Sequence, residues 1–278
     1  MQHLNKIMAI AFVPAAICAC QSLIREDRSD CPATLLFEFT DDQGLGDAEL
    51  MYLEAFPVLG PETKVTDTTT VGAMAGKSYT LQVRRSDAVS IYGLACFGRS
   101  HIVREGRWVV DPGQDGDRLY RFGAQVSGME ESAIVPVELT KEHSYIRVKF
   151  KQYDMQKEQG RFPFTVVVAA NTCGIDLYSG APVPGTFQFF PEEKLAGEFE
   201  FTVPRQADQS LTLELWDKSG GEAPLDSIVL WTLLKQVEGF SWDMKNLPDL
   251  YVEIDYVRSE VTLSISDWQT VTSIHYAI

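Results

Sequence analysis

Hydrophobic and polar residues alternate along much of this chain in short segments that are separated by turn-forming residues. Tyr145–Lys151 is the clearest case, because Ile146, Val148 and Phe150 fall on one face and Arg147 and its cationic neighbours fall on the other. An alternation with a period of two predicts a β-strand with one buried face. Repetition of this pattern through the whole chain predicts an all-β fold.

The predicted strands recur at short spacing, with few segments of helical period between them. In the first half they are Ala33–Thr40, Glu49–Phe56, Tyr79–Val83, Val89–Phe97 and Ile134–Leu139. In the second half they are Tyr145–Lys151, Phe164–Ala170, Gly197–Val203, Leu211–Trp216, Tyr251–Val257 and Val261–Trp268. Leu225–Val237 fits either a helix or a strand. Many short strands with turn signals between them predict β-sandwich architecture.

A change in pattern near residues 140–144 predicts a domain boundary. There Lys141, Glu142 and His143 interrupt the apolar alternation, and the strand plan then begins again. The 278 residues suit one large domain or two ordinary ones. We therefore predict an N-terminal sandwich over residues 33–142 and a C-terminal sandwich over residues 143–278.

The first nineteen residues have the layout of a secretory signal peptide. Lys6 is followed by an apolar run from Ile7 to Ile17, which is too short to be a permanent membrane anchor. Ile17 and Ala19 precede Cys20 at the positions typical of a bacterial lipobox, so Cys20 is the predicted lipidation site. Several acyl chains on one residue give stable membrane attachment. Residues 20–32 would then be a lipidated tether, and a plain secretory signal remains the alternative.

The charge balance excludes some partners. The net charge is −15, from 24 cationic and 39 acidic residues, whereas binding to nucleic acid requires clustered lysine and arginine. The same charge is unsuited to electrostatic adhesion to anionic lipid, so the acyl chains alone would hold the protein at a membrane.

No constellation typical of an enzyme is visible, and we predict no catalytic residue, cofactor or metal site. His101, His143 and His275 are the histidines beyond the signal peptide, and none stands in a metalloprotease motif. We interpret His143 and His275 as solvent-exposed. The acidic loop Asp111–Asp117 has oxygen ligands at alternate positions, but its spacing fits a surface turn better than a calcium loop.

Cysteine and tryptophan leave two questions open. The sequence does not fix the disulfide state of Cys31, Cys96 and Cys173, although a bond between the first two is conceivable after export. The tryptophans are spread along the chain, which is typical of core or edge-covering residues in a sandwich. They are Trp108, Trp216, Trp231, Trp242 and Trp268. A glycan-binding protein would instead present several of them on one face.

Several motifs together resemble the fimbrial anchor lipoproteins of Bacteroides-type Gram-negative bacteria, the family of minor and major fimbrium anchor subunits. The lipobox is followed by Asp30-Cys31-Pro32 and a strand, and Ile265-Ser266-Asp267-Trp268 lies near the other end. Leu211–Asp217 and Tyr251–Tyr256 also resemble segments of that family.

The resemblance implies two tandem transthyretin-like Greek-key β-sandwich domains after a lipoprotein signal peptide. It also implies an outer-membrane lipoprotein, lipidated at Cys20 and surface-exposed, that anchors the base of a fimbrium and limits the length of its shaft. The implied partner is a fimbrial shaft subunit (fimbrillin), bound by β-strand complementation. The alternative function is that of a surface glycan-binding lipoprotein.

Overall fold

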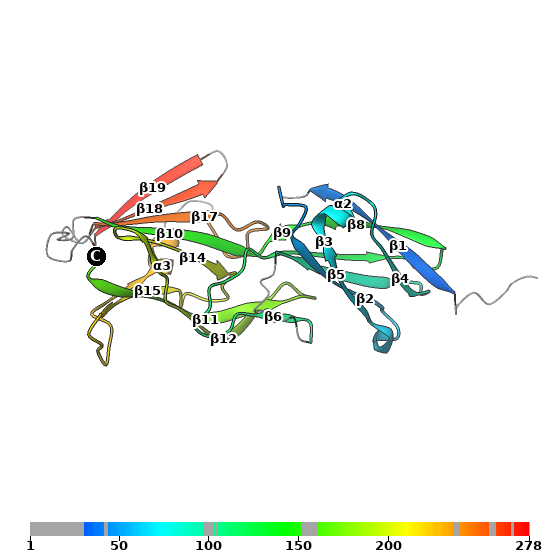
Figure 1. The fold of residues 1–278 in the computed structure, drawn as a ribbon, viewed down its shortest axis with the longest axis horizontal. Helices are drawn as coiled ribbons and strands as arrows, with labels where there is room; N and C mark the ends of the chain where they lie inside the picture. The colour runs from blue at the N-terminus through cyan, green and yellow to red at the C-terminus, as the bar shows by residue number, and fades with distance from the viewer. Residues whose placement is uncertain are drawn as a thin grey trace, which may run out of the picture.

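Strands dominate the computed structural model, which describes residues 31–41, 44–96, 103, 105–151, 161–235, 240–255, 260–267 and 270–277. The strands form four sheets in two bodies that lie end to end along the molecule (Figure 1). Each body has its own hydrophobic core. The predicted all-β fold class is confirmed. No described helix is long and apolar enough to cross a bilayer.

The first body contains sheets A and B. Sheet A has the order β4 (Thr80–Arg84), β1 (Pro32–Asp41) and β8 (Ser132–Glu138). Sheet B has the order β3 (Val65–Thr70), β2 (Leu50–Pro57), β5 (Val89–Ala95), β7 (Tyr120–Val126) and β9 (Thr140–Lys141). Two short helices, η1 (Pro61–Thr63) and α2 (Val71–Ala75), flank β3. The Thr70 hydroxyl caps α2 by accepting a hydrogen bond from the Ala73 N–H at 3.2 Å.

The second body contains sheets C and D. Sheet D has the order β13 (Glu193–Leu195), β14 (Glu198–Pro204), β10 (His143–Lys151), β17 (Asp249–Asp255), β18 (Glu260–Asp267) and β19 (Thr270–Ala277). Sheet C has the order β12 (Pro182–Phe189), β11 (Phe164–Asp176), β15 (Thr212–Asp217) and β16 (Asp226–Val229), and β6 (Arg107–Val109) pairs with β11. A short helix, α3 (Leu230–Leu234), follows β16.

The same arrangement of a central strand occurs in both bodies. In sheet A, β1 lies between β4, its antiparallel neighbour, and β8, its parallel neighbour. In sheet D, β10 lies between the antiparallel β14 and the parallel β17. Sheet D continues past β17 with the hairpin β18–β19, whereas β8 is the last described strand of sheet A.

The alternation of apolar and polar residues in β1 explains why one face of this strand packs in the first core. Ala33, Leu35 and Phe37 are buried in the first core, while Leu36 and Glu38 on the other face of the strand are exposed. Because β1 is hydrogen-bonded on both sides and buried on one face, its removal would open a groove between β4 and β8.

The strand β6 belongs in space to the second body. It pairs with residues 174–176 of β11, and Trp108 is fully buried in the second core. The backbones can approach because Gly174 has no side chain; a Cβ there would lie 2.1 Å from the Trp108 carbonyl oxygen. Val110 and Leu119, from the same part of the sequence, also pack in the second core. Part of the predicted N-terminal domain therefore builds the C-terminal core.

Each strand predicted from alternation overlaps an observed strand, although Phe97, residues 256–257 and Trp268 lie outside the described residues. The ambiguous segment Leu225–Val237 contains both β16 and α3. The strands that the sequence did not predict carry weaker signals. For example, β3 is rich in threonine without an apolar face, and β12 contains two prolines and a glycine.

Replacement of Leu35 by alanine should destabilise the first body by about 2–5 kcal/mol, because the fully buried side chain would leave a cavity between the sheets. Leu36→Ala, on the exposed face of the same strand, should cost less than about 1 kcal/mol. Urea denaturation of the two variants measures both losses of unfolding free energy. Equal losses would show that β1 does not pack as described.

Candidate binding site at the junction of the two bodies

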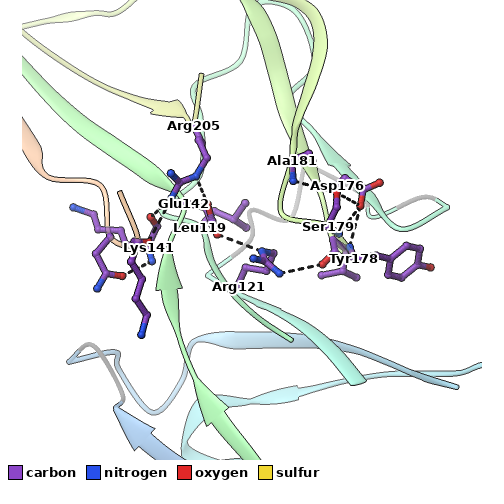
Figure 2. Close-up of polar contacts among 12 residues, drawn as sticks. Leu119, Arg121, Lys141, Glu142, Asp176, Tyr178, Ser179, Ala181 and Arg205 are labelled. Atoms are coloured by element: carbon purple, nitrogen blue, oxygen red, sulfur yellow. Dashed lines mark hydrogen bonds and ion pairs between the residues drawn. The ribbon is translucent and has the colours of Figure 1, made fainter. Parts of the chain in front are cut away.

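A buried carboxylate lies where the two bodies meet. Glu142 precedes β10, and its side chain is only 2% exposed. Its Oε2 accepts a hydrogen bond from Arg205 Nε at 2.6 Å, and its Oε1 accepts one from Arg121 Nε at 3.3 Å. Figure 2 shows the carboxylate between the two guanidinium groups. A buried charge requires such partners, because burial without them costs several kcal/mol.

The two arginines extend this cluster into both bodies. Arg121 lies on β7 of sheet B, and its Nη1 reaches the Leu177 carbonyl oxygen, just beyond β11, at 3.5 Å. Arg205 directly follows β14 and donates to the carbonyl oxygens of Trp242 and Lys245. Gly180 leaves space for Arg121, since a Cβ there would lie 2.4 Å from its Nη2. The Glu142 carboxylate thus connects sheet B with the end of β14 in sheet D, and Arg121 adds a contact to the end of β11 in sheet C.

His143, next to Glu142, is buried, so our interpretation of this residue as solvent-exposed was wrong. Its Nδ1–H donates to the Leu119 carbonyl oxygen at 3.0 Å, and its ring packs edge-on against Tyr120. Burial, together with the charge of Lys141, lowers the pKa of His143 to about 4. The imidazole is therefore neutral at pH 7. The charged segment 141–143 that looked like a linker is part of the packed junction.

A second polar contact joins the bodies on the same face of sheet B as Arg121. Glu54, on β2, is buried and accepts hydrogen bonds from the hydroxyls of Tyr52 and Tyr178, both at 2.6 Å. Tyr178 lies in the turn between β11 and β12, where Asp176 and Ser179 hold the backbone. Burial and the Glu54 carboxylate raise the pKa of Tyr178 above its ordinary value, so the phenol remains a donor.

The acidic loop at residues 111–117 docks on sheet D. Asp115 Oδ1 accepts a hydrogen bond from the Thr202 N–H at 2.8 Å, and Asp117 Oδ2 accepts one from Trp108 Nε1 at 3.2 Å. Across the described ranges, no group of three or more histidine, cysteine, aspartate or glutamate residues is placed to hold a metal ion. The loop's carboxylates instead fix β6 and β14 to one another.

An open cleft of about 1060 Å³ lies beside the buried cluster. Its lining comes from the segment after β14, from the β11–β12 turn, from α3 and from the segment before β17. The lining residues that matter here are Arg121, Glu142, Arg205, Gln206, Trp231 and Trp242.

Two buried polar atoms in this lining have no hydrogen-bond partner. They are Oε1 of Gln206, which is 2% exposed, and Nε1 of Trp242, which is 6% exposed. A buried polar group without a partner costs about 1–3 kcal/mol, and such groups are rare in folded proteins. Both atoms are covered by protein, so a ligand in the cleft does not reach them in this conformation. No local sequence signal marks either residue, because their proximity depends on the fold.

The other predicted residues are distributed through the structure. Cys20 lies outside the described residues, and so do His101 and Trp268. The described cysteines have free thiols, with Cys31 exposed, Cys96 half-buried and Cys173 buried. Burial raises the pKa of Cys96 to about 12, so this thiol stays protonated. Trp108 is buried and Trp216 is half-buried, so the described tryptophans form no exposed row.

Solved structures with this fold come from Porphyromonas gingivalis and from species of Bacteroides. The fimbrial anchor protein Mfa2 from Porphyromonas gingivalis superimposes with a TM-score of 0.62 at 10% identity, covering 84% of this chain and 97% of that chain. A candidate polysaccharide-binding protein (DUF1812) from Bacteroides thetaiotaomicron has a TM-score of 0.62 at 12% identity, with coverages of 88% and 98%. A candidate adhesin from Bacteroides ovatus has a TM-score of 0.60 at 13% identity, with coverages of 91% and 97%.

These similarities confirm, at the level of fold, the resemblance to fimbrial anchor proteins that the motifs predicted. The likeness is structural, since no family model and no curated protein sequence matches the chain.

The buried histidine predicts a pH dependence of stability. Because its pKa is about 4 in the folded protein and about 6.5 in the unfolded chain, the unfolded state binds more protons between these values. The contribution of His143 is complete above pH 6.5 and decreases by about 3 kcal/mol as the pH falls to 4. Chemical denaturation across this range should show that loss.

His143→Phe is the test variant, because it keeps a ring against Tyr120 and does not titrate. The difference in unfolding free energy between wild type and variant should change with pH only between about 4 and 6.5. A difference that is constant through this window would contradict the burial of a neutral imidazole.

Proposed function

We propose that this protein is the lipid-anchored base of a cell-surface fimbrium. In this proposal Cys20 carries the acyl chains that hold it at the outer membrane, and the far end of the molecule binds a shaft subunit. The observation that carries the proposal is the position of β1, which directly follows the predicted tether and is fixed in the middle of sheet A.

The position of β1 suits a strand under tension. A pull on the tether acts along β1, so the hydrogen bonds to β4 and β8 are loaded together in shear rather than broken one after another. The buried Leu35 and Phe37 side chains would also have to leave the first core before β1 could slide. A load on the lipid anchor would therefore be distributed over the whole first body.

The same position of β1 supports a role in limiting shaft length. Polymerisation by strand exchange requires an open groove in each subunit that accepts the next one. Here β1 fills the space between β4 and β8. A subunit that retains β1 accepts no further strand there, so its addition ends the filament.

The opposite end of the molecule offers an edge for strand addition. Among the described strands, β19 pairs only with β18 along its eight residues, Thr270–Ala277. This hairpin lies at the end of the molecule remote from the start of β1 (Figure 1). An unpaired edge presents backbone N–H and C=O groups to an incoming strand. We infer that a shaft subunit binds along β19.

The structural neighbours support a cell-surface role of this kind, since one of them is a fimbrial anchor protein and another is a candidate adhesin. They equally fit a protein without catalytic activity.

Surface glycan binding is the second candidate function. The observation in its favour is the open cleft at the junction, whose lining includes Trp231 and Trp242. A structural neighbour described as a candidate polysaccharide-binding protein points the same way.

Replacement of Cys20 by alanine should release the protein and its fimbriae from the cell, because the acyl chains are the proposed membrane attachment. Mass spectrometry of the wild-type protein should find fatty acid on an N-terminal Cys20, and the shaft subunit should co-purify with the membrane fraction. Cys18→Ala is the matched control and should change neither result.

A chain that ends after Asp267, and so lacks β19, separates the two parts of the proposal. It should remain in the membrane and lose the shaft subunit. Unlipidated wild-type protein would contradict the membrane attachment, and retention of the shaft by the shortened chain would contradict the role of β19.

A further inference from the structure

The loops at one end of the first body expose a group of apolar residues. Val58 and Leu59 lie in the loop after β2, and Met129 lies in the loop between β7 and β8. They are 45%, 85% and 51% exposed, and Leu59 is the most exposed large hydrophobic residue in the described part of the chain. Single exposed apolar residues are ordinary in proteins, but a group of them on one surface typically marks an interaction site.

Strand register places the two loops at the same end of sheet B. Pro57, the last residue of β2, pairs with Val89, the first residue of β5. Val89 in turn pairs with Val126, the last residue of β7. The loops that follow β2 and β7 therefore leave the sheet at one level.

The turn at residues 85–88, which precedes β5, connects these two loops. The Ala88 carbonyl oxygen accepts a hydrogen bond from the Val58 N–H at 3.0 Å. The Ser86 carbonyl oxygen accepts one from the Gly128 N–H at 2.9 Å. Because the same turn is bonded to both loops, the exposed apolar residues belong to one surface, which we call the loop end of the first body.

Hydrogen bonds hold the backbone on which Leu59 and Met129 are presented. Gly60 has a φ of 113°, which favours glycine, and its carbonyl oxygen accepts from the Thr63 hydroxyl at 3.0 Å and the Thr63 N–H at 3.2 Å. The Met129 carbonyl oxygen accepts a hydrogen bond from Arg85 Nη1 at 2.9 Å. Since both loops are already ordered, burial of their side chains against a partner costs little further conformational entropy.

The loop end is also where β1 begins. Pro32 pairs with Arg84, the residue directly before the turn at 85–88. The Thr34 N–H donates to the carbonyl oxygen of Glu131, in the same loop as Met129, at 2.9 Å. The start of β1 therefore lies beside both loops, at this end of the molecule (Figure 1).

The length of the tether identifies the surface that these loops meet. Eleven residues lie between Cys20 and Pro32, and even fully extended they span only about 40 Å. A chain held by lipid at Cys20 thus keeps its loop end close to the bilayer. A tethered contact forms at a high effective concentration, so lipid is favoured here over a freely diffusing partner.

The charges of the loop end favour an apolar contact. Its charged residues have both signs, with acidic Glu62, Asp87, Glu130 and Glu131 and cationic Lys64, Arg84 and Arg85. Such a mixture gives no strong attraction to a partner of either sign. The groups that gain most from contact are therefore the exposed apolar side chains.

We propose that the loop end of the first body inserts Val58, Leu59 and Met129 into the surface of the bilayer that carries the anchor. Apolar side chains gain free energy when they leave water for the boundary between headgroups and acyl chains. The contact holds the first body against the membrane and fixes the direction in which β1 leaves it. The acyl chains then provide attachment, and the loops provide orientation.

This inference deepens the proposed function and rests on its membrane attachment near residue 20. The fatty acid on Cys20 and the contact of the loops with lipid are read by separate measurements. An acylated chain whose loops do not reach lipid would contradict this inference alone, whereas a chain without fatty acid would contradict the proposed attachment.

The test uses the full chain, purified in detergent and reconstituted into vesicles of phosphatidylcholine that is brominated on its acyl chains. Bromine quenches the fluorescence of indoles that enter the bilayer. In Met129→Trp the added indole should lose at least half of its emission relative to vesicles without bromine, after subtraction of the wild-type signal. Mass spectrometry of the same sample reports the fatty acid on Cys20.

Leu59→Asp and Leu225→Asp, each added to the Met129→Trp chain, form a matched pair, because both leucines are exposed and Leu225 lies in the second body. Leu59→Asp should reduce the quenching at least threefold, and Leu225→Asp should leave it unchanged. Both chains should unfold at the temperature of the parent, which separates lost contact from lost folding.

The proposal is overturned if the indole added in Met129→Trp is not quenched, since the loop end would then be covered by protein or left in water. It is equally overturned if the chain with Leu59→Asp is quenched as strongly as the chain with Leu225→Asp.

Discussion

The structure depends on one buried carboxylate that is shared by two arginines. Glu142 sits between Arg121 of the first body and Arg205 of the second, and both guanidinium groups also donate to backbone carbonyl oxygens. Removal of one member from such a cluster typically costs about 3–5 kcal/mol, because the remaining charge is left buried without a partner. The cluster is therefore a central polar contact between the two β-sandwich bodies.

Other contacts also hold the two bodies together. The strand β6 lies between strands of the first body in the sequence, but it pairs with β11 in sheet C of the second body. The loop at residues 111–117 binds β14 through Asp115. Glu54 and Tyr178 make a further contact between the bodies. With β1 fixed at one end and the β18–β19 hairpin at the other (Figure 1), these contacts suit the proposed transmission of load from a membrane to a filament.

Strand positions could be predicted from the sequence wherever one face is buried, because alternation records that burial locally. The β10 segment with Ile146, Val148 and Phe150 is an example. The role of segment 141–143 could not be predicted, because Glu142 and His143 are buried only by partners far away in the chain, namely Arg205, Arg121 and Leu119. The cleft was missed for the same reason, since Gln206 and Trp242 carry no local signal. The lipidation motif at Cys20 is local, and it stays a prediction.

The most direct test of the central claim measures how rigidly Glu142 holds the two bodies together. Spin labels on Leu59→Cys and Leu225→Cys, two exposed positions in different bodies, report the distance between them once Cys31 and Cys96 are replaced by serine. We expect a single narrow distance distribution that broadens in Glu142→Ala. It should stay narrow in Glu200→Ala, which removes a surface ion pair with Arg147 within the second body. A distribution that is equally narrow with and without the Glu142 carboxylate would contradict the account.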